Sequence, residues 1–254
     1  MASSGAWIRR YLSLAEPRQR LICFPHAGGS ASYYRALARS LGSTGTEVLV
    51  VQYPGRQERI AEPAAREVAE ILTGTWDELL SALGDGRPFG LFGHSMGTVL
   101  AFETARRLER EEHGPAALFV SARQAPSAAQ PADLAARLAD TDDEELVTEL
   151  QLLGGLAQEL LQYPEMIRLA LSWLRADIAL LGRYTYRPGA PLRCPVVTLV
   201  GDTDPHVPAE SMRSWRTETD GAFEAHVLDG GHFYFDAEDR LAEVCKIVDV
   251  GLRR

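Results

Sequence analysis

The sequence has few cysteines and no long apolar run. Its three cysteines, Cys23, Cys194 and Cys245, lie far apart and are odd in number. This spacing argues against a disulfide framework or a local metal site, so we expect structural thiols in a reducing compartment. No apolar run approaches the ~18–20 residues that a membrane-spanning helix needs. We therefore expect no membrane segment.

Positive charge is also scarce. Lys246 is the only lysine, and the net charge of the chain is −9. Because nucleic-acid binding relies on clustered basic side chains, this balance argues against a nucleic-acid partner. The first ten residues lack the long apolar stretch that follows the basic start of a secretory signal, so we expect a cytoplasmic protein.

The chain does contain a regular alternation of short apolar runs and longer amphipathic segments. This alternation predicts a mostly parallel sheet with crossover helices, in one α/β domain over residues 1–254. The predicted strands are residues 20–24, 47–52, 89–92, 116–121, 195–200 and 224–228. The predicted helices are residues 32–41, 62–83, 98–108, 131–138, 142–153, 164–181 and 238–252.

Residues 126–186 interrupt the alternation, because they contain no strand-like run. Crossover connections are usually shorter than this segment. We expect a helical lid inserted over an active site. The alternative is an additional structural layer of helices.

The most informative motif is Gly93-His94-Ser95-Met96-Gly97, which follows a predicted strand and precedes a predicted helix. This is the pattern of a nucleophile elbow, a turn so tight that only small residues fit two positions either side of the serine. The serine hydroxyl is held at a helix N-terminus, where free N–H groups favour negative charge. The alternative without catalytic function is a serine that only caps the helix N-terminus.

A serine nucleophile needs a base, and the base needs an orienting acid. In the α/β-hydrolase arrangement the acid and then the histidine follow the serine along the chain. His232 follows the last predicted strand after two glycines, which makes it the candidate base. The acid is Asp204 or Asp202, both after the preceding strand. We prefer Asp204, which lies deeper in the loop, because Asp202 is better placed to cap the turn.

The tetrahedral intermediate of acyl transfer carries an oxyanion that needs two donors. One predicted donor is the backbone N–H of Met96, directly after the nucleophile. The other is the backbone N–H of Ala27, in a loop whose glycines let the backbone approach a ligand closely. A phosphate cradle is the competing interpretation of this loop, but the expected lysine is missing.

With these motifs in place, the chain resembles the type II thioesterases, stand-alone α/β-hydrolases of polyketide and nonribosomal peptide pathways. The resemblance extends over nearly the whole chain. It rests on Leu21–Gly29, Tyr53–Arg59, Gly93–Gly97, Gly201–Asp204 and Gly230–Phe233. The Tyr-Pro-Gly-Arg segment is the most specific, because generic hydrolases do not carry it. The family acid matches Asp204.

The resemblance implies hydrolysis of acyl thioesters on the phosphopantetheine arm of an acyl or peptidyl carrier protein, with acyl-CoA as a further substrate. It implies clearance of stalled or misprimed acyl groups and no metal or organic cofactor. The insertion over residues 126–186 is rich in apolar side chains, which either hold the acyl chain or pack on the sheet. These side chains are Leu156, Leu160, Leu161, Ile167, Leu171, Trp173, Leu174 and Leu181.

Arg56 and Arg59 follow a predicted strand, so they are candidates for a patch that docks an acidic carrier protein. The alternative for Arg56 is a buried salt bridge.

Three other functions use the same fold: a carboxylesterase or lipase, a ring-forming thioesterase, and a non-catalytic receptor. A preference for oxygen esters would indicate the carboxylesterase or lipase, and a cyclic product would indicate the ring-forming thioesterase. A serine that does not react with a fluorophosphonate probe would indicate the receptor.

Overall fold

The computed structural model describes residues 7–128, 141–155 and 162–253. Its centre is a seven-stranded sheet in the order β1-β3-β2-β4-β5-β6-β7. β1 pairs antiparallel with β3, and every other neighbouring pair is parallel, which confirms the predicted mostly parallel sheet. The strands are β1 (Ile8–Arg10), β2 (Gln19–Phe24), β3 (Thr46–Val51), β4 (Phe89–His94), β5 (Ala117–Ser121), β6 (Val196–Gly201) and β7 (Phe223–Leu228).

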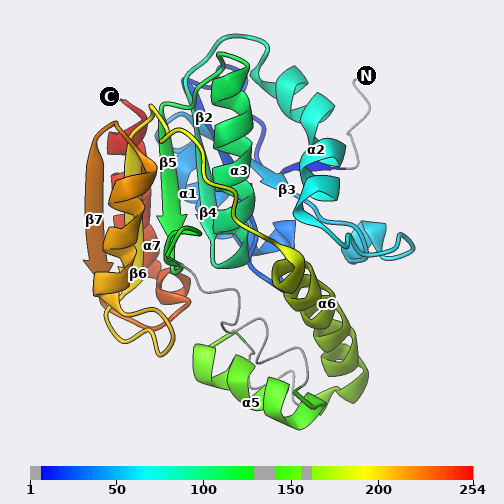
Figure 1. Cartoon of the computed structure of the whole chain (residues 1–254). Helices are drawn as coiled ribbons and strands as arrows, with labels where there is room; N and C mark the ends of the chain where they lie inside the picture. The colour runs from blue at the N-terminus through cyan, green and yellow to red at the C-terminus, as the bar shows by residue number, and fades with distance from the viewer. Residues whose placement is uncertain (1–6, 129–140, 156–161, 254) are drawn as a thin grey trace.

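Helices cover both faces of this sheet (Figure 1). The α-helices are α1 (Arg35–Gly42), α2 (Val68–Leu83), α3 (Met96–Arg110), α5 (Asp143–Leu153), α6 (Pro164–Arg183) and α7 (Glu238–Leu252). Short 3-10 helices are η1 (Ala31–Tyr34), η2 (Gln57–Arg59), η4 (Ala209–Glu218) and η5 (Tyr234–Asp236).

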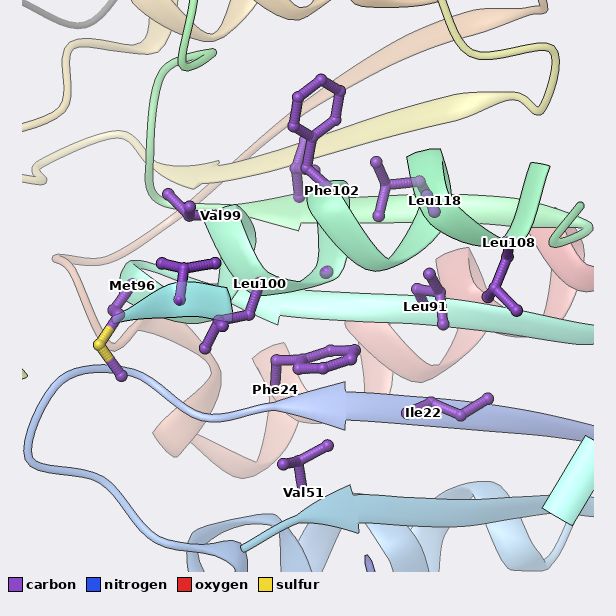
Figure 2. Packing of buried hydrophobic residues seen from close by; sticks show 14 of the residues in the cluster. Ile22, Phe24, Val51, Leu91, Met96, Val99, Leu100, Phe102, Leu108 and Leu118 are labelled. Carbon is purple, nitrogen blue, oxygen red and sulfur yellow. The ribbon is translucent and has the colours of Figure 1, made fainter. Parts of the chain in front are cut away.

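Two hydrophobic cores form because strand side chains alternate between the faces. Along β2, Ile22 and Phe24 face the core under α2 and α3, while Leu21 and Cys23 face the core under α1 and α7. Figure 2 shows the first of these cores, with side chains of α3 meeting those of β2, β4 and β5. This packing holds the β4–α3 turn at a fixed place on the sheet.

The structure differs from the sequence prediction at two elements near the N-terminus. β1 was not predicted, because Ile8-Arg9-Arg10 is too short and too charged to show a strand pattern. α2 begins at Val68, whereas the amphipathic pattern predicted a start at residue 62. Pro63 disfavours helical backbone at Glu62, and Arg59 holds the Glu62 carboxylate instead.

α5 and α6 lie beyond the carboxyl ends of the sheet strands (Figure 1). They contact each other through a separate cluster made of Leu146, Leu171, Leu174 and Ile178. The side chain of Asp142 accepts a hydrogen bond from the Glu145 N–H at 2.9 Å and so caps α5. The predicted helix at 131–138 and the apolar residues Leu156, Leu160 and Leu161 lie outside the described residues.

Candidate active site

The turn between β4 and α3 has the geometry of a nucleophile elbow. Ser95 has φ 52° and ψ −116°, a strained conformation for a residue with a side chain. A Cβ on Gly97 would lie 1.9 Å from the Phe24 carbonyl oxygen, and one on Gly93 would lie 2.4 Å from the Gly97 oxygen. Only glycine fits at either position, so the motif spacing is a steric requirement of the turn.

Ser95 stands at the N-terminus of α3. Its carbonyl accepts the Thr98 N–H at 3.0 Å, and its own N–H donates to the Ser121 carbonyl at 2.8 Å. Met96 is the first residue of the helix and is fully buried beneath the turn. The helix dipole therefore favours negative charge beside Ser95.

His232 and Asp204 form a buried pair on neighbouring loops. The His232 Nδ1 lies 2.7 Å from the Asp204 Oδ2, and their side chains are 6% and 0% exposed. The other carboxylate oxygen, Oδ1, accepts the N–H groups of His206 and Val207 at 2.9 and 3.1 Å. Both carboxylate oxygens of Asp204 thus accept hydrogen bonds, one from the imidazole and the other from the backbone of its own loop.

The pKa of Asp204 lies below its ordinary value. Burial alone would raise it, but the hydrogen bond and charge of His232, with the backbone N–H groups of His206 and Val207, lower it by more. Asp202 differs: its residue is exposed, and its Oδ1 accepts the Gly230 N–H at 2.9 Å. The Asp202 carboxylate thus binds the neighbouring loop after β7 rather than capping its own turn, as the sequence pattern had suggested it would.

Two further histidines, His94 and His26, lie near the imidazole of His232. The centroid of the His94 ring lies 5.0 Å from that of His232, and His94 Nδ1 bonds the Ser121 hydroxyl at 2.8 Å. Desolvation and the nearby His232 lower the pKa of His94. The same causes, with Arg56, lower the pKa of His26 to about 3. Both rings therefore stay neutral next to the pair.

Ser95, His232 and Ala27 line one cavity of about 70 Å³. The remaining lining is mostly apolar and comes from α5 and α6; its aliphatic members are Leu146, Leu150, Leu153, Leu174, Ile178 and Leu181. The sequence-predicted serine and histidine thus meet at one cavity, with Asp204 directly behind the histidine. Two polar lining residues, Arg123 and Glu149, were not predicted.

The loop after β2 forms a tight turn at this cavity. The Gly29 N–H donates to the His26 carbonyl at 3.0 Å, and Gly28 has φ +73°. The Gly28 N–H donates to Asp177 on α6 at 2.8 Å. Asp177 was missed from the sequence, because a lone acid in an amphipathic helix carries no local signal.

The expectation of an exposed docking patch at Arg56 and Arg59 is wrong, because the structure buries both residues. Arg56 is 1% exposed and pairs with Asp177, as its salt-bridge alternative required. Arg59 is 5% exposed, donates to the Gln52 carbonyl and to Glu62, and lies over the Trp7 ring. Neither guanidinium is presented to a partner.

Within the described ranges, no group of histidine, cysteine, aspartate or glutamate side chains is arranged to hold a metal ion. All three cysteines are buried free thiols. No helix in the described part of the chain is both long and apolar enough to cross a bilayer.

The parallel sheet, the strained serine and the buried histidine–aspartate pair define a protein of the α/β-hydrolase fold. The chain matches the thioesterase domain family over residues 19–250. It is 43% identical to the thioesterase PikA5 of Streptomyces venezuelae, over 95% of this chain and 84% of that protein.

Solved structures agree with this match. The type II thioesterase BorB from the borrelidin biosynthetic cluster is 41% identical, with a TM-score of 0.83 and 97% of each chain covered. YbtT, a type II thioesterase from the yersiniabactin NRPS/PKS pathway, is 27% identical, with a TM-score of 0.81 and 98% of each chain covered. The chain belongs to the thioesterase family, and it is a serine hydrolase that acts on thioesters.

Proposed function

We propose that this chain hydrolyses acyl groups from the phosphopantetheine arm of acyl or peptidyl carrier proteins, and so clears stalled or misprimed synthases of polyketide or nonribosomal peptide pathways. The observation that carries the proposal is the single cavity that Ser95, His232 and Ala27 share beneath the helices α5 and α6. Relatives such as YbtT, from an NRPS/PKS pathway, support the assignment of the substrate class.

In the proposed mechanism the Ser95 Oγ attacks the thioester carbonyl carbon. Because the Nδ1 of His232 is held by Asp204, Nε2 is the nitrogen left to accept the serine proton. The ionised Asp204 keeps the ring in that tautomer and stabilises the imidazolium. Collapse of the tetrahedral intermediate breaks the C–S bond, and His232 returns the proton to the departing thiolate.

The second half of the reaction removes the acyl group from Ser95. His232 takes a proton from water, whose oxygen attacks the ester carbonyl, and the free acid leaves as Ser95 regains its proton. In both halves, the oxyanion accepts hydrogen bonds from the backbone N–H groups of Ala27 and Met96. A thiolate is a good leaving group, so proton donation from the imidazolium is sufficient for its departure.

We assign α5 and α6, within the insertion over residues 126–186, the role of a lid. Their aliphatic side chains supply most of the cavity wall, which suits an acyl chain and excludes water from the ester. No metal or organic cofactor takes part in these steps; the pantetheine belongs to the substrate.

The test compares hydrolysis of acyl-carrier, acyl-CoA and acyl-pantetheine thioesters with hydrolysis of oxygen esters of the same acyl group. We expect a higher kcat/KM for the carrier-bound thioester than for the other substrates. A strong preference for the oxygen ester would assign the chain to carboxylesterase chemistry instead. A folded protein whose Ser95 fails to react with a fluorophosphonate probe would be a non-catalytic receptor.

A further inference from the structure

A buried ion pair joins the loop after β3 to the helix α6. Nη1 of Arg56 lies 2.7 Å from the Asp177 Oδ2, and Nη2 lies 2.7 Å from Oδ1. The two side chains are 1% and 4% exposed. A two-point contact of this kind fixes orientation as well as distance, because both groups are planar. The proposed reaction gives the pair no role.

Both members of the pair also bind the turn that carries Ala27. The Asp177 Oδ2 accepts the Gly28 N–H at 2.8 Å. The Arg56 Nη1 donates to the Gly29 carbonyl at 2.8 Å. The two side chains of one salt bridge therefore hold the 27–28 and 29–30 peptide groups, one on each side of the 28–29 peptide.

These contacts determine the direction of the Ala27 N–H. That N–H shares a planar peptide with the His26 carbonyl, and the carbonyl accepts the Gly29 N–H at 3.0 Å. The bond, with φ +73° at Gly28, is the signature of a type II turn. Rotation of the 26–27 peptide would break this bond, and Arg56 and Asp177 hold the other two groups in place.

The same helix forms a wall of the cavity. A Cβ on Gly28 would touch the Cβ of Leu174 at 3.5 Å, so α6 packs directly on the turn. Leu174 and Ile178, on either side of Asp177 in sequence, line the cavity. One helix thus supplies the acyl-facing surface and the acid that holds the turn.

We propose that Asp177 and Arg56 are positioning residues that hold the Ala27 N–H toward the oxyanion, so that the oxyanion hole forms only when α6 is seated on the turn. This inference rests on the proposed role of Ala27 in thioester hydrolysis. It also explains the Tyr-Pro-Gly-Arg segment at residues 53–56, because this segment places the Arg56 side chain against the turn.

The test is Asp177→Asn. The amide presents an N–H group to one arm of Arg56, so the two-point contact fails with almost no change of volume. We expect kcat to fall ~10- to 100-fold, less than the ~10²–10³-fold cost of deleting an oxyanion donor. KM should change by less than about threefold, and the pH midpoint of the rate should not move.

A boronic acid inhibitor gives the decisive second readout, because its serine adduct is a tetrahedral anion like the intermediate. The affinity of the enzyme for this inhibitor should fall by the same factor as kcat. A neutral substrate analogue, with a thioether in place of the thioester, should bind with unchanged affinity. If Asp177→Asn does not fold, Arg56→Met with Asp177→Leu removes the pair without leaving a buried charge. The same losses are expected for it.

The matched control is Glu47→Gln, which breaks a buried pair with Arg20 far from the turn. It should lower stability but leave kcat unchanged. Retention of kcat within about twofold in Asp177→Asn, or equal losses in the control, would overturn the positioning role. Failure of the proposed function would give a different result, because the wild type itself would then hydrolyse no thioester. In that case the variants are compared on the oxygen ester instead.

Discussion

Asp202 and Asp204 share one loop but have different surroundings. The Asp204 carboxylate is enclosed by an imidazole and two backbone N–H groups, whereas Asp202 is exposed and holds Gly230. The Asp204 carboxylate contacts the imidazole and can fix its tautomer, whereas the Asp202 carboxylate binds a backbone N–H of the next loop. The two residues thus offer a comparison within one loop.

At this scale we predict that Asp204→Asn lowers kcat by ~10³- to 10⁴-fold, because the amide favours the wrong imidazole tautomer. Asp202→Asn keeps an oxygen for the Gly230 N–H and should change kcat by less than about threefold. Steady-state kinetics on one acyl-pantetheine thioester measures both. Equal effects of the two changes would contradict the assignment of the acid.

The residues that could be predicted from sequence are those with a local signal. The glycines around Ser95 are required by contacts inside one turn, so the motif indicates the geometry. Asp177 lies 121 positions from Arg56, and only the folded chain brings the two together. The sequence pattern also placed Arg56 and Arg59 on a loop, but a loop position does not determine whether a side chain is buried.

At the scale of elements, strand alternation and chain order were sufficient to predict the parallel sheet. The elements that escaped prediction lack an apolar period. β1 is a three-residue edge strand, held by its pairing with β3 rather than by its own sequence. The later start of α2 is consistent with Pro63, which disfavours helical backbone at Glu62 and which an amphipathic pattern alone does not take into account.

A small apolar cluster holds α5 and α6 together beside the cavity. Leu146 is 0% exposed in that cluster and also lines the cavity. Leu146→Ala should destabilise the helix pair locally by ~2–5 kcal/mol and enlarge the cavity. We expect faster amide exchange in α5 and α6, and a kcat/KM profile shifted toward longer acyl chains.

Leu152→Ala is the control, because Leu152 lies on the same helix and is 61% exposed. It should leave both the exchange rates and the acyl preference unchanged. An unchanged profile for Leu146→Ala would mean that these helices pack on the sheet without contacting the acyl group.

At the scale of the molecule, neutral histidines in the interior link stability to pH. In the folded state the pKa of His26 is about 3, and that of His94 is also lowered. Free histidine titrates near pH 6.5. Between these values the unfolded chain binds more protons than the folded one, so stability falls as the pH is lowered from about 6.5 toward 3.

We predict that His26→Phe loses less stability on acidification than the wild type. Between pH 7 and pH 5, the His26 contribution is about 2 kcal/mol, from the linkage relation and the two pKa values. Urea unfolding at both pH values measures the difference. His113→Phe, at an exposed site, is the control and should follow the wild type. Parallel curves for His26→Phe and wild type would contradict a neutral His26.

The role of Ser95 as the nucleophile is tested most directly by the rate at which Ser95→Ala releases free acid from an acyl-carrier thioester, compared with the wild type under single-turnover conditions. We expect a fall of ~10³-fold or more, with the melting temperature nearly unchanged. A folded Ser95→Ala protein that keeps more than about a tenth of the wild-type rate would contradict this role.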